Sequence, residues 1–408
     1  MKKNRTLNIR GTLLDRGQLS KYIEKIAAEH NVKSSSEKET YPIPKVKEDY
    51  RFILETYKLL NKHIKLGIKI HSAGEWLLDN FYIIEEAVKS IEKEMPLKKY
   101  KAMIGMANGR FQGFARSYVL AEEIVAYTDC KIDREVIDLC LKSYQKKKFL
   151  SMDEIWNIGI FFKISMISHI REVCEKIYSS QIQKYKVESI IERVIDGKSI
   201  DESKFKTISN VKVFSDTELK YPFIEYMSYK LKIYGKKAIE YQSVLENEVL
   251  KLGVTLSDVI QKEHLYIANL KIKMGNCITS IKAVNRISFS ELFSYINISE
   301  EILKMDPAGV YGEMDQDSKS YYRSKIEELS KKSKISEIYI CEKIIELCKK
   351  YENYKNIEEK KKAHVGYYLI DDGIDELNNL LEIVALYYFK IVSKWKEKYG
   401  EDSIKFYC

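Results

Sequence analysis

The stretch GEWLLDNFYIIEE, residues 74–86, places four carboxylates around a tryptophan on one expected helix. Glu75 and Asp79 are four residues apart, so they project from the same side of that helix with the spacing of a general acid/base pair. The apolar residues recur at intervals of three and four from Leu77 to Met95 and fall on the opposite side. The pattern therefore favours a solvated acidic face over an acid/base site.

A second candidate is a possible metal site in the stretch EMDQDSKS, where Asp315 and Asp317 form an Asp-x-Asp motif. Many sugar-nucleotide transferases hold a divalent cation and a diphosphate with such a motif, because paired carboxylate oxygens suit hard cations. That motif belongs at the end of a strand in a nucleotide-binding domain, whereas here a helix is expected to follow. We therefore favour Asp317 or Ser318 as the N-cap of that helix.

The stretch GMANGRFQGFARSY, residues 105–118, is a candidate anion site because glycines surround Arg110 and Arg116 ahead of an expected helix. It matches neither the dinucleotide fingerprint nor the P-loop. A tight connection whose arginines pair with carboxylates is the favoured interpretation. The six histidines fall on separate elements, and we expect no catalytic triad.

The elements that must position these residues are helices. Only five prolines and 17 glycines interrupt the chain, and apolar spacings of three and four predominate, so we predict an all-α, elongated multi-helix bundle with short connections, no sheet and no repeat array. Capping boxes are expected at Ser72–Glu75, Ser151–Glu154 and Ser288–Glu291. The expected helices span about 18–30, 46–66, 73–95, 116–128, 133–146, 152–179, 184–195, 221–251, 256–285, 289–304, 318–332, 336–350 and 357–398, with breaks near residues 235 and 373.

The predicted domain organisation follows the two polar, weakly patterned segments of the chain. Residues 1–45 are an N-terminal helix and linker, and 46–195 are a first helical bundle. Residues 196–220 read as a loop or boundary, and 221–408 as a second bundle.

Composition limits the classes of protein that fit. The net charge is +9, but the lysines are spread along the chain, so no nucleic-acid partner is expected. No apolar run is long enough to span a membrane, and no apolar segment follows the basic N-terminus, so export is not indicated. Seven cysteines without CxxC pairs fit reduced thiols and predict no metal site and no disulfide framework. These features predict a cytoplasmic location.

The last stretch, LLEIVALYYFKIVSKWKEKYGEDSIKFYC, mixes aromatic residues with lysines. Such a mixture suits a membrane interface or a partner helix, because lysines reach past aromatic rings toward the headgroups. An ordinary amphipathic C-terminal helix explains it equally well.

Six stretches, read together, carry a family resemblance. They are LLDRGQL (13–19), GEWLLDNFYIIEE (74–86), ARSYVLAEEIVAYTD (115–129), GNCITSIKAVNRISFSELF (275–293), DPAGVYGEMD with YYR (306–323) and HVGYYLIDDGIDEL (364–377). In this order they resemble the N-terminal region of the cyclic β-1,2-glucan synthases. The chain departs from the family pattern at Gln316, Lys319 and Ser320, where an aromatic residue and an Arg-Asp pair are usual.

The resemblance implies a part of a large inner-membrane protein. Such synthases polymerise glucose from UDP-glucose, with a divalent cation, in a membrane-embedded glycosyltransferase domain, and they cyclise the glucan in domains further downstream. The matched region precedes these domains and holds no matched catalytic residue or cofactor site, so the chain is expected to be an excerpt or a truncated product. The family extends its glucan from a protein-attached primer, and no tyrosine here is assigned to that role.

We therefore expect a non-catalytic accessory region on the cytoplasmic side of the inner membrane. Its expected partners are the membrane face and the glycosyltransferase domain of the same synthase. The alternatives are a glucan-acting enzyme that uses helix carboxylates such as Glu75 and Asp79, and a free-standing helical interaction protein.

Overall fold

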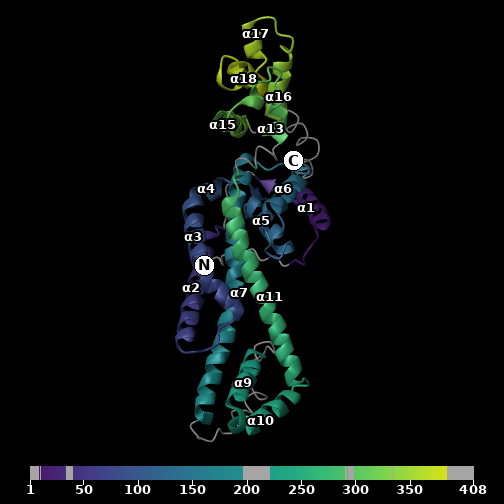
Figure 1. Ribbon diagram of the computed structural model, residues 1–408. Coiled ribbons are helices and arrows are strands. Elements are labelled where there is room, and N and C mark those ends of the chain that lie inside the picture. Colours follow the sequence, from purple (N-terminus) through teal and green to yellow (C-terminus); the bar gives the residue numbers. More distant parts are fainter. Residues whose placement is uncertain are drawn as a thin grey trace. The chain divides into compact units, whose positions relative to one another are not determined.

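The computed structural model describes residues 9, 11–33, 40–195, 221–289, 292, 298–333 and 335–383 (Figure 1). The chain divides into two compact units, Met1–Ile287 and Ser288–Cys408. Both units are helical, so the predicted all-α class is confirmed. The only strands among the described residues are β1 (Val32–Lys33) and β2 (Gly105–Met106), which pair antiparallel over two residues each.

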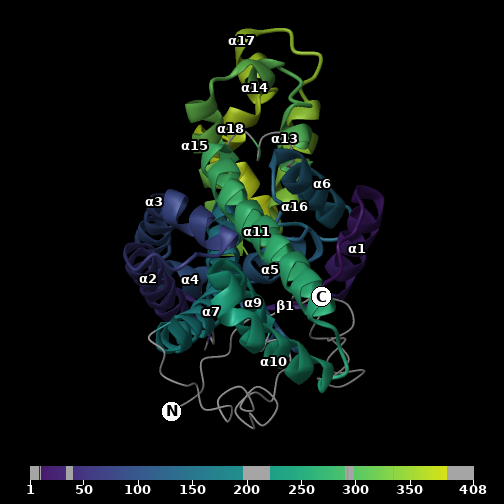
Figure 2. The ribbon, with the colours of Figure 1, turned by 60° about the horizontal axis from the view of Figure 1, so that its bottom comes forward.

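The first unit is built around two long helices, α7 and α11. Its helices are α1 (Arg16–Glu29), α2 (Ile43–Lys65), α3 (Ser72–Glu94), α4 (Leu97–Ala102), α5 (Arg116–Tyr127), α6 (Arg134–Gln145), α7 (Met152–Ile195), α9 (Tyr221–Tyr234), the 3-10 turn η2 (Gly235–Ala238), α10 (Ile239–Leu250) and α11 (Leu256–Arg286). Helix α7 packs against α2, α3, α5, α9 and α11, and α11 also packs against α3 and α9. Figure 2 shows α1 with α6 on one side of α11, and α2 with α3 on the other.

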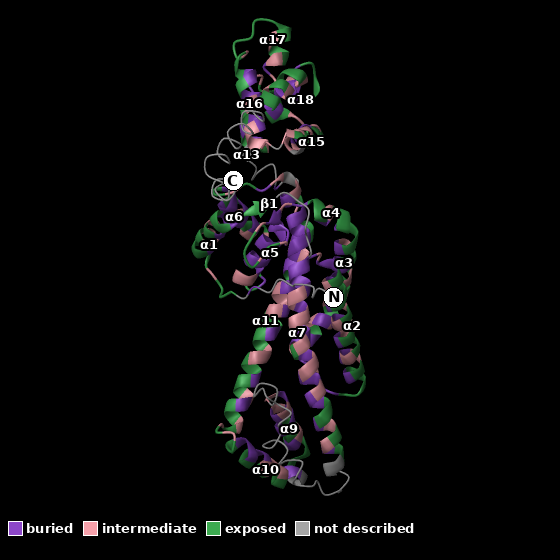
Figure 3. Ribbon diagram, turned by 180° about the vertical axis from the view of Figure 1, so that it is seen from behind, coloured by how far each residue is buried: buried purple, intermediate pink, exposed green. Residues whose placement is uncertain are grey.

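The core of the first unit lies where α7 passes between α3, α5 and α11. Phe161, Phe162 and Ile167 are buried there, and Figure 3 shows this half of α7 as an almost continuous buried stretch. Because α7 has 44 residues, it extends over about 66 Å at 1.5 Å per residue. The sequence predicted two helices here, 152–179 and 184–195. That prediction was wrong, because the intervening SQIQ (180–183) contains no helix breaker and Gln181 is buried.

The second unit is a smaller set of helices around α16. Its elements are α13 (Ile298–Leu303), α14 (Val310–Glu313), α15 (Gln316–Ser333), α16 (Glu337–Lys349), α17 (Ile357–Lys362), α18 (Val365–Ile370) and a helical stretch at 374–383. Helix α16 packs against α13, α15 and α18. Its buried face, with Ile340 and Ile344, shares one apolar core with Tyr368 and Leu377.

The helix starts test the predicted capping boxes. Ser151 and Glu154 form one, since the Ser151 N–H donates to Glu154 Oε2 at 2.9 Å and the Glu154 N–H donates to Ser151 Oγ at 3.4 Å. The box at Ser72 is wrong: His71 is the N-cap of α3, and its Nδ1 accepts from the Ala73 N–H at 3.3 Å. The box at Ser288–Glu291 falls partly outside the described residues.

The helix predicted at 357–398 is interrupted at two places. The predicted break near Gly373 is present as a turn. A second break falls at His364, because the N–H of Val365 donates to the side chain of Asp306 instead of a helix carbonyl. Residues beyond 383, with the aromatic and basic tail, lie outside the described residues.

The two units do not follow the predicted boundary. Residues 196–220 lie outside the described residues, and the structure separates the units between Ile287 and Ser288. Residues 221–287, predicted to begin a second bundle, pack instead on the first unit through α9 and α11. The N-terminal helix α1, predicted as a separate segment within 1–45, packs against α6.

Candidate functional site

The acidic face of α3 lies in solvent. Glu75, Asp79 and Glu86 are exposed, and the apolar stripe from Leu77 to Met95 is buried on the other side at most positions. Directly after Asp79, the backbone of Asn80 departs from helical geometry, with φ −121° and ψ 16°. Its Oδ1 accepts from Lys282 Nζ of α11 at 3.1 Å. The polar group that makes a tertiary contact here is thus Asn80. Within the described part of the chain, the exposed carboxylates of Glu75 and Asp79 form no hydrogen bond or ion pair to another side chain.

The two arginines of the glycine-rich stretch do not come together. Arg110 is exposed, with its guanidinium 4.3 Å from the ring centroid of Phe111. Arg116 is 3% exposed and binds Glu154 with both arms, Nε to Oε1 at 2.7 Å and Nη2 to Oε2. Burial acts to lower the pKa of Arg116, but the Glu154 carboxylate outweighs it and the pKa is raised. This pair joins the start of α5 to the first turn of α7.

The Asp-x-Asp motif lies at the start of α15. Asp315 is the N-cap: its Oδ1 accepts from the Ser318 N–H at 2.8 Å and its Oδ2 from Ser318 Oγ at 2.7 Å. These bonds, first the backbone one, lower the pKa of Asp315. Asp317 is exposed in the first turn. The prediction of Asp317 or Ser318 as the N-cap was therefore wrong, because the cap is Asp315. Within the described ranges, no group of three or more His, Cys, Asp or Glu side chains is placed to hold a metal ion.

The polar centre of the second unit is a buried carboxylate, Asp306, that sequence reasoning did not select. Its Oδ2 accepts from the N–H groups of Val310 and Tyr311 at 3.2 and 3.0 Å, and its Oδ1 from the N–H of Val365 at 3.2 Å. His364 Nδ1 lies 2.7 Å from the same Oδ2. We call Asp306, His364 and the N–H groups around them the Asp306 centre. It closes the loop before α14 onto the start of α18.

Tyr322 extends this centre into a line of three polar side chains. Its hydroxyl lies 3.4 Å from His364 Nε2, so Asp306, His364 and Tyr322 follow the order of an acid, an imidazole and a hydroxyl. Burial, with the charges of Asp306 and Asp371, raises the pKa of Tyr322. A phenol that is 8% exposed and held neutral is a poor nucleophile, so the arrangement favours a structural role.

A second buried network in the same unit joins α13, α14 and α15. Tyr311 donates its hydroxyl to Glu300 Oε2 at 2.9 Å, and Arg323 Nη1 lies 3.4 Å from the same oxygen. Lys319, where the resemblance led us to expect a different pattern, donates to the Gly312 carbonyl at 2.8 Å. The stretches DPAGVYGEMD, YYR and HVGYY thus converge, with their polar groups directed at one another.

The first unit holds a buried acid that the sequence also left unmarked. Glu122 of α5 is buried, accepts from Ser165 Oγ at 2.9 Å, and has a pKa raised to about 7 by burial. Its neighbour Glu123 is buried too and accepts from the hydroxyl of Tyr22 at 2.7 Å. An adjacent Glu-Glu pair on a helix resembles a solvated face. The available signal was the apolar residues on every side of α5, which indicate burial all round.

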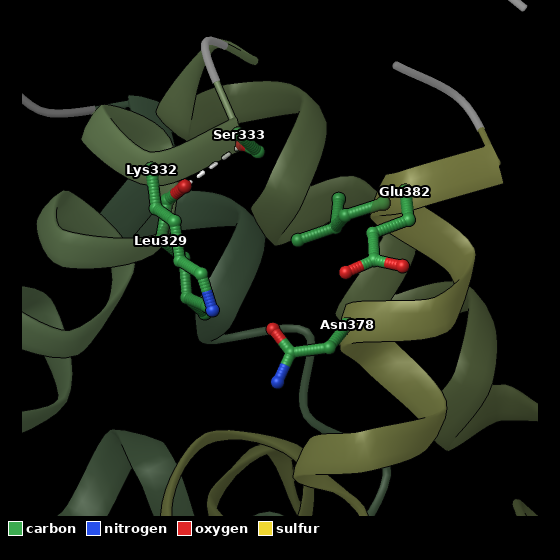
Figure 4. A pocket seen from close by; sticks show the side chains of 6 residues that line it. Leu329, Lys332, Ser333, Asn378 and Glu382 are labelled. Carbon is green, nitrogen blue, oxygen red and sulfur yellow. Dashed lines mark hydrogen bonds between the residues drawn. The ribbon is translucent and has the colours of Figure 1, made fainter. Parts of the chain in front are cut away.

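One pocket of about 180 Å³ lies in the second unit between α15 and the helical stretch 374–383 (Figure 4). Lys332 extends from α15 on one side, and Asn378 and Glu382 extend from the other. Neither the sequence-predicted candidates nor the Asp306 centre lines it.

Together these placements define an all-α protein in which several buried polar side chains form hydrogen bonds or ion pairs with another helix or loop. Across the described part of the chain, no helix is long and apolar enough to cross a bilayer. No protein-family model matches the chain. It is 21% identical over 326 residues to the cyclic β-(1,2)-glucan synthase NdvB of Rhizobium meliloti (strain 1021), which confirms the resemblance seen in the six stretches. The match covers 79% of this chain and 11% of that protein, so the chain corresponds to a small part of its relative's length.

Proposed function

We propose that this chain is a helical accessory region that acts in cyclic β-1,2-glucan synthesis without itself transferring glucose. The observation that carries the proposal is the hydrogen bonding of polar side chains in the stretches that resemble the synthases. These stretches contain four such residues, Asp306, Tyr311, Arg323 and His364. The polar side chain of each one contacts another part of the same unit through a hydrogen bond or ion pair. Polar side chains that serve a fold, and not a reaction, are expected to pair with one another in this way.

The placement of the candidate acids supports the same proposal. Glu75 and Asp79 are exposed on a helix surface, and Asp315 caps a helix. A general acid or base needs a pocket that holds the substrate within hydrogen-bond reach. UDP-glucose and a divalent cation are accordingly assigned to the polymerising domain of a synthase, and that domain and the cytoplasmic membrane face are the proposed partners.

Two experiments test the proposal. The purified chain, incubated with UDP-glucose and either Mg²⁺ or Mn²⁺, should release no UDP and form no glucan; sustained turnover would overturn the non-catalytic part. In the source organism, deleting the coding region for residues 13–377, which spans the six resembling stretches, should abolish or sharply reduce cyclic β-1,2-glucan, measured by mass spectrometry of cell extracts. Unchanged glucan would overturn the role in synthesis.

A complementation arm separates this proposal from a glucan-acting enzyme. The chain with Glu75→Gln and Asp79→Asn should restore glucan to the wild-type amount, because exposed carboxylates on α3 do no chemistry. Loss of glucan with the fold intact, judged by circular dichroism, would favour the enzyme instead.

A further inference from the structure

The turn between α2 and α3 presents apolar side chains to solvent on a rigid frame. Helix α2 ends there in a Schellman motif: the Gly67 N–H donates to the Ile64 carbonyl at 3.0 Å, and the Ile68 N–H to the His63 carbonyl at 3.0 Å. Gly67 takes the left-handed φ of +71° that this motif requires. His63 and Ile68 are buried beneath the turn. Ile64 and Leu66, in contrast, are 49% and 55% exposed.

The C-terminal end of α9 continues this surface. Lys69 Nζ lies 5.0 Å from the ring centroid of Tyr229, and Ile68 shares an apolar core cluster with Met227 and other residues of α9. One helical turn after Tyr229, Ile233 is 57% exposed. Residues 62–69 and 229–234 therefore form one surface, which we call the basic–apolar patch. In Figure 1 both segments lie toward the same end of the first unit.

The charge of the basic–apolar patch has one sign. Its two segments, KHIKLGIK and YKLKIY, contain five lysines and no carboxylate. Lys230 lies 2.7 Å from Glu188, which neutralises it. Lys62, Lys65 and Lys232 are exposed around the apolar side chains. A soluble surface usually intersperses both signs of charge, so this combination calls for an anionic and partly apolar partner.

An anionic lipid surface has that chemistry. Aliphatic side chains at the tip of a turn can enter the boundary between headgroups and acyl chains, while lysines around them reach lipid phosphates. We propose that the basic–apolar patch docks the first unit peripherally on a membrane that contains anionic phospholipid. The inference deepens the proposed function, on which it rests for the presence of a membrane.

The test measures co-sedimentation of the full chain with vesicles of phosphatidylcholine, with or without 40% phosphatidylglycerol. The wild type should bind the anionic vesicles and not the neutral ones. Ile64→Ser with Leu66→Ser should weaken binding on the order of tenfold through lost apolar insertion. Lys65→Glu should weaken it about 25-fold, because each charge near an anionic surface contributes about fivefold.

Matched controls come from α17, which has no buried residue. Ile357→Ser and Lys361→Glu each make one change of the same type on an exposed side chain of the second unit and should leave vesicle binding unchanged. The inference would be overturned if the patch variants bound vesicles as well as the wild type does, or if the controls lost as much binding as the patch variants. It would also be overturned if the wild type did not bind anionic vesicles. If the chain supports glucan formation but binds neither type of vesicle, the membrane-docking inference is wrong while the proposed function is unaffected.

Discussion

Replacing Asp306 by alanine should strongly destabilise the second unit. Four donors lose their acceptor: the N–H groups of Val310, Tyr311 and Val365, and the imidazole of His364. A buried donor left unpaired costs about 1 to 3 kcal/mol, and water reaching the half-buried imidazole recovers part of this. We expect a total loss of about 4 kcal/mol, a large fraction of the stability of a domain of this size.

The assay follows thermal unfolding of the full chain and hydrogen exchange of peptides from residues 300–370. At about 4 °C per kcal/mol, the midpoint of the second unit should fall by about 15 °C. The matched control is Asp315→Ala, which removes an exposed N-cap carboxylate and should cost about 1 kcal/mol. If Asp306→Ala lowers the midpoint no more than this control does, the assignment of Asp306 as the centre of the unit is refuted.

Three further predictions concern single contacts. Gly366→Ala should cost about 1 to 3 kcal/mol in thermal unfolding, because a Cβ would overlap the hydroxyl of Tyr322. Arg116→Met should cost about 3 to 5 kcal/mol by leaving Glu154 buried and unpaired, and Glu154→Leu in the same chain should recover at least half of that in urea titrations. Burial raises the pKa of Glu122 from its ordinary value of 4.5 to about 7 in the folded state, so its proton stabilises the folded state most at low pH. That contribution is lost as pH rises from about 4.5 through 7. Glu122→Gln should remove up to about 3 kcal/mol of the difference in unfolding free energy between pH 5 and pH 8.

Controls of the same chemistry accompany these variants. Gly312→Ala adds a Cβ that has no other atom within 4 Å. Its melting temperature should stay within about 2 °C of the wild-type value, as is usual for substitutions at exposed positions. Glu86→Gln changes an exposed carboxylate of α3 and should leave the pH dependence as in the wild type. An unchanged pH slope for Glu122→Gln, or an additive double variant at Arg116 and Glu154, would contradict the assigned contacts.

Local sequence patterns were sufficient to predict the fold class. The spacing from Leu77 to Met95 predicted α3, and the Ser151–Glu154 pair marked the start of α7, because both signals lie within a few residues of one another. His71 was missed as a cap because an imidazole is an unusual acceptor at that position. The merging of two predicted helices into α7 depended on tertiary burial, which local spacing does not contain.

The buried polar contacts of Asp306 and of Glu122 and Glu123 could not be predicted from local sequence patterns, because their partners lie far away along the chain. Asp306 and His364 are 58 residues apart, and nothing between them repeats or alternates to indicate contact. Glu122 and Glu123 resemble solvent-facing acids until Ser165 and Tyr22 are placed beside them. The family resemblance did identify the stretches that contain these residues, but it could not say that their side chains bind one another.

The packing of α11 on α3 has a consequence for how the protein is made. Helix α3 ends at Glu94, and the helix that covers it ends at Arg286, about 190 residues later. At about 5 to 20 residues per second, the ribosome needs about 10 to 40 s to deliver the covering helix. During that interval the apolar surface of α3 that awaits α11 has no partner, so the nascent chain should depend on chaperones until Arg286 has left the exit tunnel.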